Sequence, residues 1–281
     1  MDKVLVTGGA RGIGEHIVRQ MCKLGYHVII AARDEERAQR IIDEIYAGKG
    51  GALVEFSRCD LSSIQSTFEF IEKVKVENPD LKVLINNAGI WPNKLELNTE
   101  GIEMAFMVNH IAPMMLSLGL KNLLISNGPS RIVNVNAGLY LKGNFHPEKT
   151  PTGVDFHKIK TYANTKLCSV MFGLEFQQLI KDQRLTLNMI HPGVIKTDLG
   201  DFGGVLGFLL RQVKKLWKPV DKGAEIPVWL AIDPALEGVT GQYYNERKPL
   251  PYSDKALDVE ARKKLWQISM AMIQSTVSLK Y

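Results

Sequence analysis

The stretch Thr7-Gly8-Gly9-Ala10-Arg11-Gly12-Ile13-Gly14 follows directly on the apolar run from Val4 to Val6. Beyond it, Ile17, Met21 and Leu24 repeat at helical spacing, so the glycines stand between a strand and a helix. Glycines in this context allow a tight turn and a close approach of the backbone to a phosphate, and the helix N-terminus favours negative charge. The stretch therefore predicts the phosphate-binding turn of a dinucleotide-binding fold.

The rest of the chain repeats this alternation of strand and helix. Apolar runs typical of buried parallel strands lie at 4–6, 27–31, 53–56, 83–85, 132–135 and 185–190, and helical patterns lie at 12–24, 34–47, 101–125, 158–181 and after a capping box at 62–65. This order predicts an α/β fold, a doubly wound parallel sheet (Rossmann fold) with helices on both faces. Because no linker, repeat or low-complexity tract interrupts the chain, we expect residues 1–281 to form a single domain.

Composition excludes several classes of protein. Hydrophobic residues make up 45% of the chain and charged residues 23%, which is ordinary for a globular protein with a large core. The net charge of +5 comes from scattered lysines and arginines, so we expect no nucleic-acid partner. Cys22, Cys59 and Cys168 lack metal-type spacing, which predicts reduced, buried thiols and no metal site. With neither a signal peptide nor a membrane-spanning run in the sequence, we expect a cytoplasmic protein.

Two segments depart from the alternation. Residues 141–160 are polar and contain two prolines, and we expect them to cover the cleft beside the following helix. Residues 200–218 carry an apolar stripe opposite several basic residues. That pattern favours a lid helix, and the alternative is a peripheral membrane contact through residues 204–218.

Tyr162 and Lys166 stand four residues apart in a helical pattern and so share one face. A free phenol, with a pKa of about 10, is a poor base at neutral pH, and a nearby ammonium favours its phenolate form. Together with the glycine turn, the pair predicts hydride transfer between a nicotinamide and a carbonyl or alcohol. The alternative is a core tyrosine with a satisfied hydroxyl.

The end of the second strand distinguishes the two nicotinamide dinucleotides. An acidic residue there would bind the ribose hydroxyls, but this chain has Ala31-Ala32-Arg33, with Arg11 available in the turn. A guanidinium binds phosphate in a bidentate manner, which predicts NADP(H). The alternative is an ion pair between Arg33 and Glu36. Asp60 is expected to bind the adenine, with helix capping as its alternative role.

These motifs together resemble the short-chain dehydrogenase/reductase family. The resemblance rests on Thr7 to Gly14, Asn86-Asn87-Ala88-Gly89, Asn109, Tyr162-x-x-x-Lys166, and His191-Pro192-Gly193 with Thr197, and it covers residues 3 to about 245. The long insertion before Tyr162, Thr197-Asp198-Leu199, Gly223-Ala224 and Asp233-Pro234 look more like the retinol dehydrogenase and carbonyl reductase branch. That branch implies a small hydrophobic carbonyl or alcohol substrate, although the likeness fixes no individual compound.

The resemblance implies a role for each matching residue. Tyr162 would be the acid/base, Lys166 would also bind the nicotinamide ribose, and Asn109 would hold a relay water or, alternatively, pin a backbone. The residues implied to border the cofactor are Gly8, Arg11, Gly12, Ile13, Gly14, Arg33, Asp60, Leu61, Asn87, Ala88, Gly89, Tyr162, Lys166, Pro192, Gly193, Ile195 and Thr197. Members of the family often pair through two long helices, so a homodimer through the methionine-bearing helix 101–125 is expected; core filling explains the methionines equally well.

One departure from the family stands out. A serine is expected just after the fifth strand, but the chain reads Val135-Asn136-Ala137-Gly138, with Ala137 in the catalytic place. Losing one oriented donor to a developing oxyanion typically costs about 10²–10³ in rate. Three explanations stay open: Asn136 acts as the replacement catalytic donor, the substrate is already activated, or the chain is a cofactor-binding regulatory or scaffold protein with weak or no reductase activity.

Overall fold

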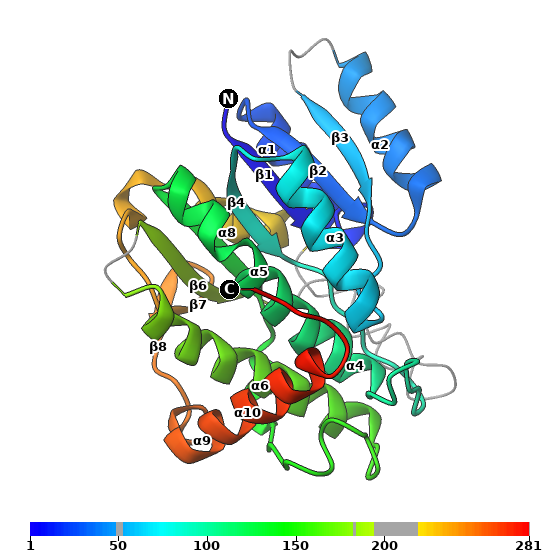
Figure 1. Cartoon of the computed structure of the whole chain (residues 1–281). Helices are drawn as coiled ribbons and strands as arrows, with labels where there is room; N and C mark the ends of the chain where they lie inside the picture. The colour runs from blue at the N-terminus through cyan, green and yellow to red at the C-terminus, as the bar shows by residue number, and fades with distance from the viewer. Residues whose placement is uncertain (49–52, 182–183, 194–218, 281) are drawn as a thin grey trace.

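A computed structural model describes residues 1–48, 53–181, 184–193 and 219–280 (Figure 1). It contains an eight-stranded sheet in the order β3-β2-β1-β4-β5-β6-β7-β8, in which only β8 is antiparallel to its neighbour. The strands are β1 Lys3–Thr7, β2 His27–Ala32, β3 Val54–Arg58, β4 Leu81–Asn86, β5 Ser130–Val135, β6 Leu185–His191, β7 Tyr243–Asn245 and β8 Lys248–Leu250. The six expected strands are confirmed, and the strand order is that of a doubly wound sheet.

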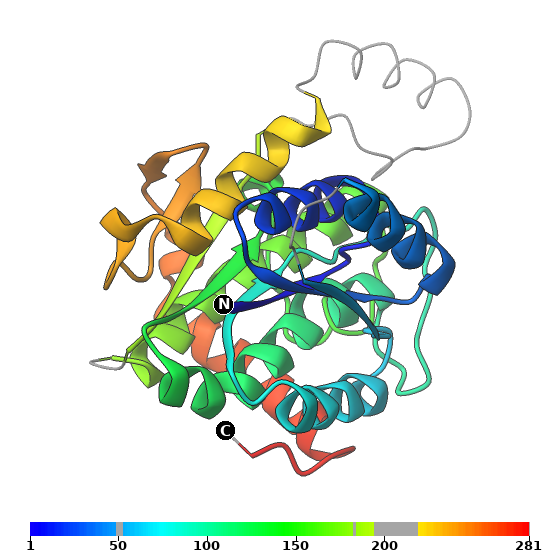
Figure 2. The same cartoon turned by 90° about the horizontal axis from the view of Figure 1, so that it is seen from above.

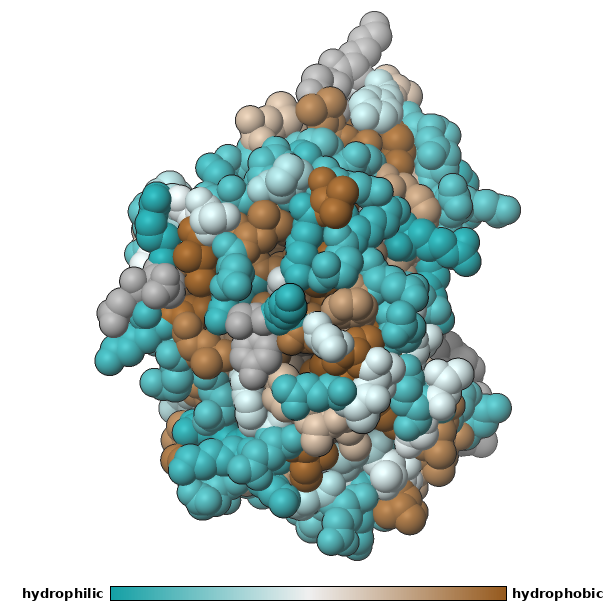
Figure 3. All heavy atoms as spheres, viewed as in Figure 1, coloured by the Kyte–Doolittle hydropathy of each residue, from teal (hydrophilic) through white to brown (hydrophobic). Residues whose placement is uncertain are grey.

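Helices cover both faces of the sheet and enclose two separate cores (Figures 1 and 2). One face carries α1 Gly12–Lys23, α2 Glu35–Ala47 and α8 Val220–Ile232, and the other carries α3 Ile64–Glu77, α5 Ala112–Asn127, α6 Lys158–Leu179 and α10 Val259–Gln274. The face in Figure 3 shows hydrophobic residues only in small patches between hydrophilic ones. None of the described helices is long and apolar enough to cross a membrane.

The expected helix over 101–125 is present, but it begins at Met104 and contains a π-helical turn. Gly101, with φ of 75°, precedes the first helical turn, and Glu103 accepts a hydrogen bond from the N–H of Phe106 at 2.7 Å. The chain then forms α4 Met104–Phe106, a π-helical turn over Met107–Ile111, and α5. A π turn holds one more residue than an α turn, so an apolar pattern alone does not reveal it.

Of two predicted helix starts, one is confirmed and the other differs by one residue. Asp34 caps α2 as expected by accepting from the N–H of Arg37. For α3 the cap is Ser63 rather than Ser62, and its Oγ accepts from the N–H of Ser66 at 3.1 Å. The cap of α3 therefore lies one residue later than the predicted capping box at 62–65 would place it.

The sequence did not reveal the hairpin of β7 and β8. Each strand has three residues, which is too short for a periodic pattern, and Glu246 in the turn between them adopts φ of 56°. In Figure 1 this hairpin extends the sheet beyond β6. It places Glu246 near the carboxyl end of β6, where the N–H of Glu246 donates to the carbonyl of His191.

The C-terminal region packs on α5 and α6 rather than leaving them bare. Its helical residues are divided at Asp258 into α9 Asp254–Leu257 and α10. Arg262 of α10 forms an ion pair with Glu175 of α6 at 2.8 Å. Residues 112–120 of α5 are all buried within the chain, so their methionines fill the core, which is the alternative role considered for them. The homodimer stays a prediction.

We predict that Leu279→Ala weakens the fold through this C-terminal packing. Leu279 is buried, and its Cδ1 would lie 3.2 Å from a Cβ built on Gly119 of α5. Removing a buried leucine side chain should lower the free energy of unfolding by about 2–5 kcal/mol in urea titrations. The control is Leu257→Ala, because Leu257 is 48% exposed; equal effects of the two changes would contradict the packing.

Candidate active site

The glycine turn is bound to the end of β4 by side chains that both sequence motifs supply. The Thr7 hydroxyl accepts hydrogen bonds from the N–H groups of Asn87 and Ala88, each at 3.0 Å. The Asn87 amide donates to the carbonyl of Thr7 at 2.9 Å. Gly8 has φ of 65°, in the left-handed region that favours glycine. These contacts fix the turn against the carboxyl edge of the sheet.

The start of α1 lies directly against the turn because Gly14 has no side chain. A Cβ on Gly14 would lie 2.1 Å from the Gly8 carbonyl oxygen and 2.6 Å from the Asn87 amide nitrogen. The cap residue Arg11 makes no side-chain hydrogen bond to the helix. The first-turn N–H groups of α1 therefore face the turn without a side-chain cap, the arrangement that suits an anion.

Two exposed guanidiniums flank this turn. Arg11 lies in it and Arg33 follows β2, and neither is ion-paired with a carboxylate of the described residues. The alternative pairing of Arg33 with Glu36 is absent from that part of the chain; Arg37 instead contacts Asp34 at 3.7 Å. Among the described residues, no carboxylate therefore competes with a phosphate for either guanidinium.

Asp60 and Leu61 fit the expected cofactor contacts less well. The Asp60 carboxylate accepts from the N–H of Ser62 at 3.0 Å, and the Asp60 carbonyl accepts from the Ser66 hydroxyl at 2.8 Å. Asp60 thus shapes the turn that leads into α3. The Leu61 side chain is buried in the core, which leaves only its backbone for a ligand.

Asn109 joins the π turn to the loop after β4. Its amide oxygen accepts from the N–H of Ile90 and its amide nitrogen donates to the carbonyl of Ile90, both at 2.9 Å. The amide nitrogen also donates to the Thr165 hydroxyl of α6 at 3.1 Å. Of the two roles considered for Asn109, pinning a backbone is the one these contacts support, since the π turn aims its amide at Ile90.

Tyr162 and Lys166 are buried together on one face of α6. Lys166 Nζ lies 5.7 Å from the centre of the Tyr162 ring and donates to the Val135 carbonyl at 3.4 Å. A Cβ on Gly89 would lie 3.5 Å from the same ammonium. The end of β5, the loop after β4 and α6 therefore meet at this pair.

Burial dominates the protonation of both groups. It raises the pKa of the Tyr162 phenol well above its ordinary value, and it lowers the pKa of the Lys166 ammonium to about 8. The phenol is thus less acidic than expected, because loss of solvent disfavours both charged forms. This shift favours the protonated phenol at neutral pH.

Asn136 does not act as the serine's replacement in this geometry. Its amide nitrogen donates to the Lys166 carbonyl at 3.2 Å, and its amide oxygen accepts from the N–H of Ala137 at 2.7 Å. The side chain is therefore turned to the backbone of α6, as the alternation along an extended strand dictates. Asn136 thus holds the backbone of Lys166. It does not supply a polar group at the position of Ala137.

A histidine beside Ala137 escaped the sequence analysis as a site residue. The His191 ring packs on Gly138, where a Cβ would meet its Cδ2 and Nε2 at 3.2 Å. Burial lowers the pKa of His191, and the Glu246 carboxylate opposes that shift. Pro192 and Gly193 follow at the end of β6, whereas Ile195, Thr197 and the expected excursion at 200–218 lie outside the described residues.

Trp91 is the second residue that sequence reasoning missed. Its ring stacks on that of Tyr162, with centroids 4.3 Å apart and planes 7° from parallel. Its Nε1 donates to the carbonyl of Lys158, at the start of α6, at 2.7 Å. The one available signal was its position, two residues after the Asn-Asn-Ala-Gly motif.

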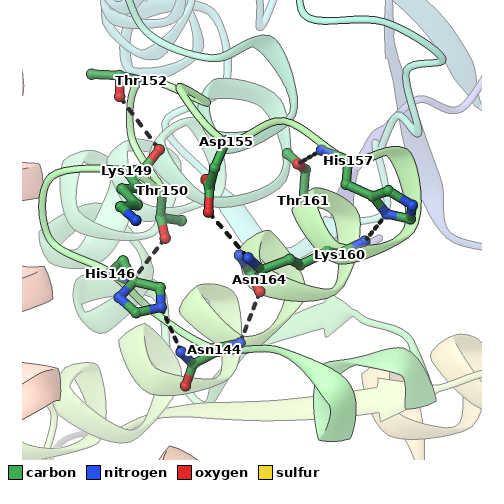
Figure 4. Close-up of polar contacts among 10 residues, drawn as sticks. All are labelled: Asn144, His146, Lys149, Thr150, Thr152, Asp155, His157, Lys160, Thr161 and Asn164. Atoms are coloured by element: carbon green, nitrogen blue, oxygen red, sulfur yellow. Dashed lines mark hydrogen bonds and ion pairs between the residues drawn. The ribbon is translucent and has the colours of Figure 1, made fainter.

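The segment expected to cover the cleft is an ordered strap over residues 143–157, fastened to α6 by polar contacts (Figure 4). At one end the N–H of Asn144 donates to the Asn164 amide oxygen at 2.8 Å, and at the other Asp155 pairs with Lys160 at 3.1 Å. Between them, the Pro151 carbonyl accepts from the N–H of Glu103 at 2.8 Å. The strap thus connects α4 with the first turns of α6, which bear Tyr162.

Comparisons with known proteins agree with this geometry. Residues 2–202 match the family model described as short chain dehydrogenase. Retinol dehydrogenase 14 of Mus musculus is 32% identical over 96% of this chain and 85% of its own length. Polyprenol dehydrogenase of Homo sapiens is 32% identical over 95% of this chain and 82% of its own length.

A solved structure shares the fold at lower identity. The L-sorbose reductase of Gluconobacter frateurii, complexed with NADPH and L-sorbose, superposes with a TM-score of 0.68 at 21% identity. The match covers 87% of this chain and 94% of that chain.

We predict that Gly14→Ala displaces α1 from the turn. The built Cβ overlaps a backbone oxygen that cannot rotate away, so the free energy of unfolding should fall by about 1–3 kcal/mol. Gly48→Ala is the control: its φ is −75° and the nearest atom to a built Cβ is 3.4 Å away. A wild-type midpoint for Gly14→Ala in thermal unfolding would contradict the close contact.

Proposed function

The chain belongs to the short-chain dehydrogenase family of oxidoreductases, and we propose that it transfers hydride between NADP(H) and a hydrophobic carbonyl or alcohol. The observation that carries the proposal is the buried Tyr162–Lys166 pair beside the glycine turn. The relatives named for retinol and polyprenol support a lipophilic substrate class. The cytoplasmic location, the single domain, the homodimer and the membrane contact through 204–218 remain predictions.

The residues around the turn fit NADP(H) in charge and shape. Gly8 and the uncapped start of α1 suit the pyrophosphate, and Arg11 and Arg33 suit the 2′-phosphate. A Cβ on Gly8 would lie 3.0 Å from the Cα of Ala88, so the turn can approach Ala88 this closely only with glycine at position 8. When bound, NADP(H) supplies or accepts the hydride at its nicotinamide.

Tyr162 supplies the proton that balances the reaction. In reduction, hydride adds to the carbonyl carbon, and the phenol O–H gives its proton to the oxygen. The raised pKa keeps this proton on Tyr162 at neutral pH, which favours the donor role. Lys166, one turn further along α6, then stabilises the phenolate that remains.

The second candidate function is a cofactor-binding regulatory or scaffold protein with weak or no reductase activity. Ala137 favours it, as does the engagement of the Asn136 amide with α6. Tight NADPH binding without NADPH oxidation across retinoids, steroids, aldehydes and ketones would select this alternative.

Tyr162→Phe should abolish carbonyl reduction and leave NADPH affinity nearly unchanged, since only the proton donor is removed. NADPH oxidation and cofactor fluorescence titration measure the two properties. Tyr46→Phe serves as control, because Tyr46 lies on α2 and is 47% exposed. Turnover that survives in Tyr162→Phe would refute the assignment of the acid.

Arg33→Ala should weaken NADPH binding by about tenfold or more, because charge-assisted hydrogen bonds contribute about 1.5–3 kcal/mol each. NADH affinity should hardly change, since NADH lacks the 2′-phosphate. Arg40→Ala, an exposed change on α2, is the matched control. Equal losses of affinity for NADPH and NADH would show that Arg33 does not bind the 2′-phosphate.

Ala137→Ser should raise kcat by up to about 10²–10³ by restoring a donor at the place the family gives to serine. Ala137→Gly controls for changes in backbone freedom. A fall in kcat for the serine variant would mean that the site is built around alanine, with the substrate oxygen held in another way.

A further inference from the structure

The loop after β4 is held at both of its ends, so Trp91 has little freedom. Thr7 binds the N–H groups of Asn87 and Ala88, and Asn109 binds both backbone groups of Ile90. Trp91 follows directly, and its Nε1 donates to the Lys158 carbonyl. The loop is therefore anchored to β1 and to the π turn, and the indole itself to the start of α6.

The anchored indole covers one face of the phenol. The 4.3 Å separation and 7° interplanar angle place the two rings in a parallel stack. Lys166 Nζ, 5.7 Å from the ring centre, limits the movement of the phenol ring from a second direction. Tyr162 is only 3% exposed, so its ring is enclosed by these neighbours.

The missing serine makes this contact more important. Where a serine and a tyrosine both hold a substrate oxygen, two donors define its position. Here Ala137 offers none, and the Asn136 amide is turned to the Lys166 carbonyl. The direction of the Tyr162 O–H must then be set by what packs against its ring.

We propose that Trp91 is a positioning residue of this site: its indole, anchored at Lys158, fixes the Tyr162 phenol in the orientation that delivers the proton. The inference rests on the proposed reductase function and adds to it a residue that acts through Tyr162. It is independent of which hydrophobic carbonyl is reduced, since the stack involves the acid and not the substrate.

The test compares Trp91→Leu with Trp91→Phe, using NADPH and a series of straight-chain aldehydes of increasing length. An aromatic pair is worth about 0.5–1.5 kcal/mol beyond its buried area, so Trp91→Leu should lower kcat by about three- to tenfold. The fall should be the same for every aldehyde, with KM and NADPH affinity unchanged. Trp91→Phe, which keeps a stacking ring, should recover most of kcat.

Trp266→Leu is the matched control. Trp266 stacks on Phe172 between α10 and α6, with centroids 6.2 Å apart and planes 16° from parallel. Its removal should lower stability without a change in kcat. If Trp91→Leu does not fold, Trp91→Met repeats the test with an unbranched apolar side chain that adapts to the same space.

Three outcomes would overturn the inference: an unchanged kcat in Trp91→Leu, a KM effect that grows with aldehyde length, or no recovery in Trp91→Phe. The second outcome would make Trp91 a wall of the substrate site. These results are read only against a wild type that reduces aldehydes and a Tyr162→Phe variant that does not. A wild type inactive on aldehydes, ketones, retinoids and steroids alike would refute the proposed function instead, and an active Tyr162→Phe would refute the assignment of the acid.

Discussion

The loop that follows β4 connects the two halves of the site, and the rest of the arrangement depends on its hydrogen bonds. On one side, the Thr7 hydroxyl and the Asn87 amide hold the loop against the glycine turn. On the other, Asn109 holds Ile90, and Trp91 rests on the phenol. A displacement of this loop would move the phosphate turn and the proton donor relative to each other, although neither belongs to it.

Burial favours the protonation state that the proposed reduction requires. A phenol whose pKa is raised keeps its proton, and an ammonium whose pKa is lowered to about 8 still carries its charge for the most part at neutral pH. A protonated phenol suits the reduction of a carbonyl, which consumes a proton. Oxidation of an alcohol would need the phenolate, the form that desolvation disfavours. The protonation of the pair thus agrees with NADPH-dependent reduction.

The sequence predicted those features that rest on local chemistry. Gly8, Gly14 and the strand runs specify the turn and the sheet, because a missing Cβ or a buried strand leaves a direct pattern. The π turn around Asn109 and the β7–β8 hairpin did not show, since one inserted residue or a three-residue strand hardly alters periodicity. The Trp91 stack and the direction of the Asn136 amide depend on long-range packing, so no single-sequence pattern contains them.

The central claim is that a nicotinamide can lie beside the Tyr162 hydroxyl and pass its hydride to a carbonyl carbon. The most direct measurement follows the label from NADPH deuterated at the transferred position into a long-chain aldehyde, by mass spectrometry of the alcohol formed. The account predicts one deuterium on the carbinol carbon, with none transferred by a Tyr162→Phe protein that still binds the cofactor. The account is contradicted if the wild type binds NADPH and no carbonyl compound yields a deuterated alcohol.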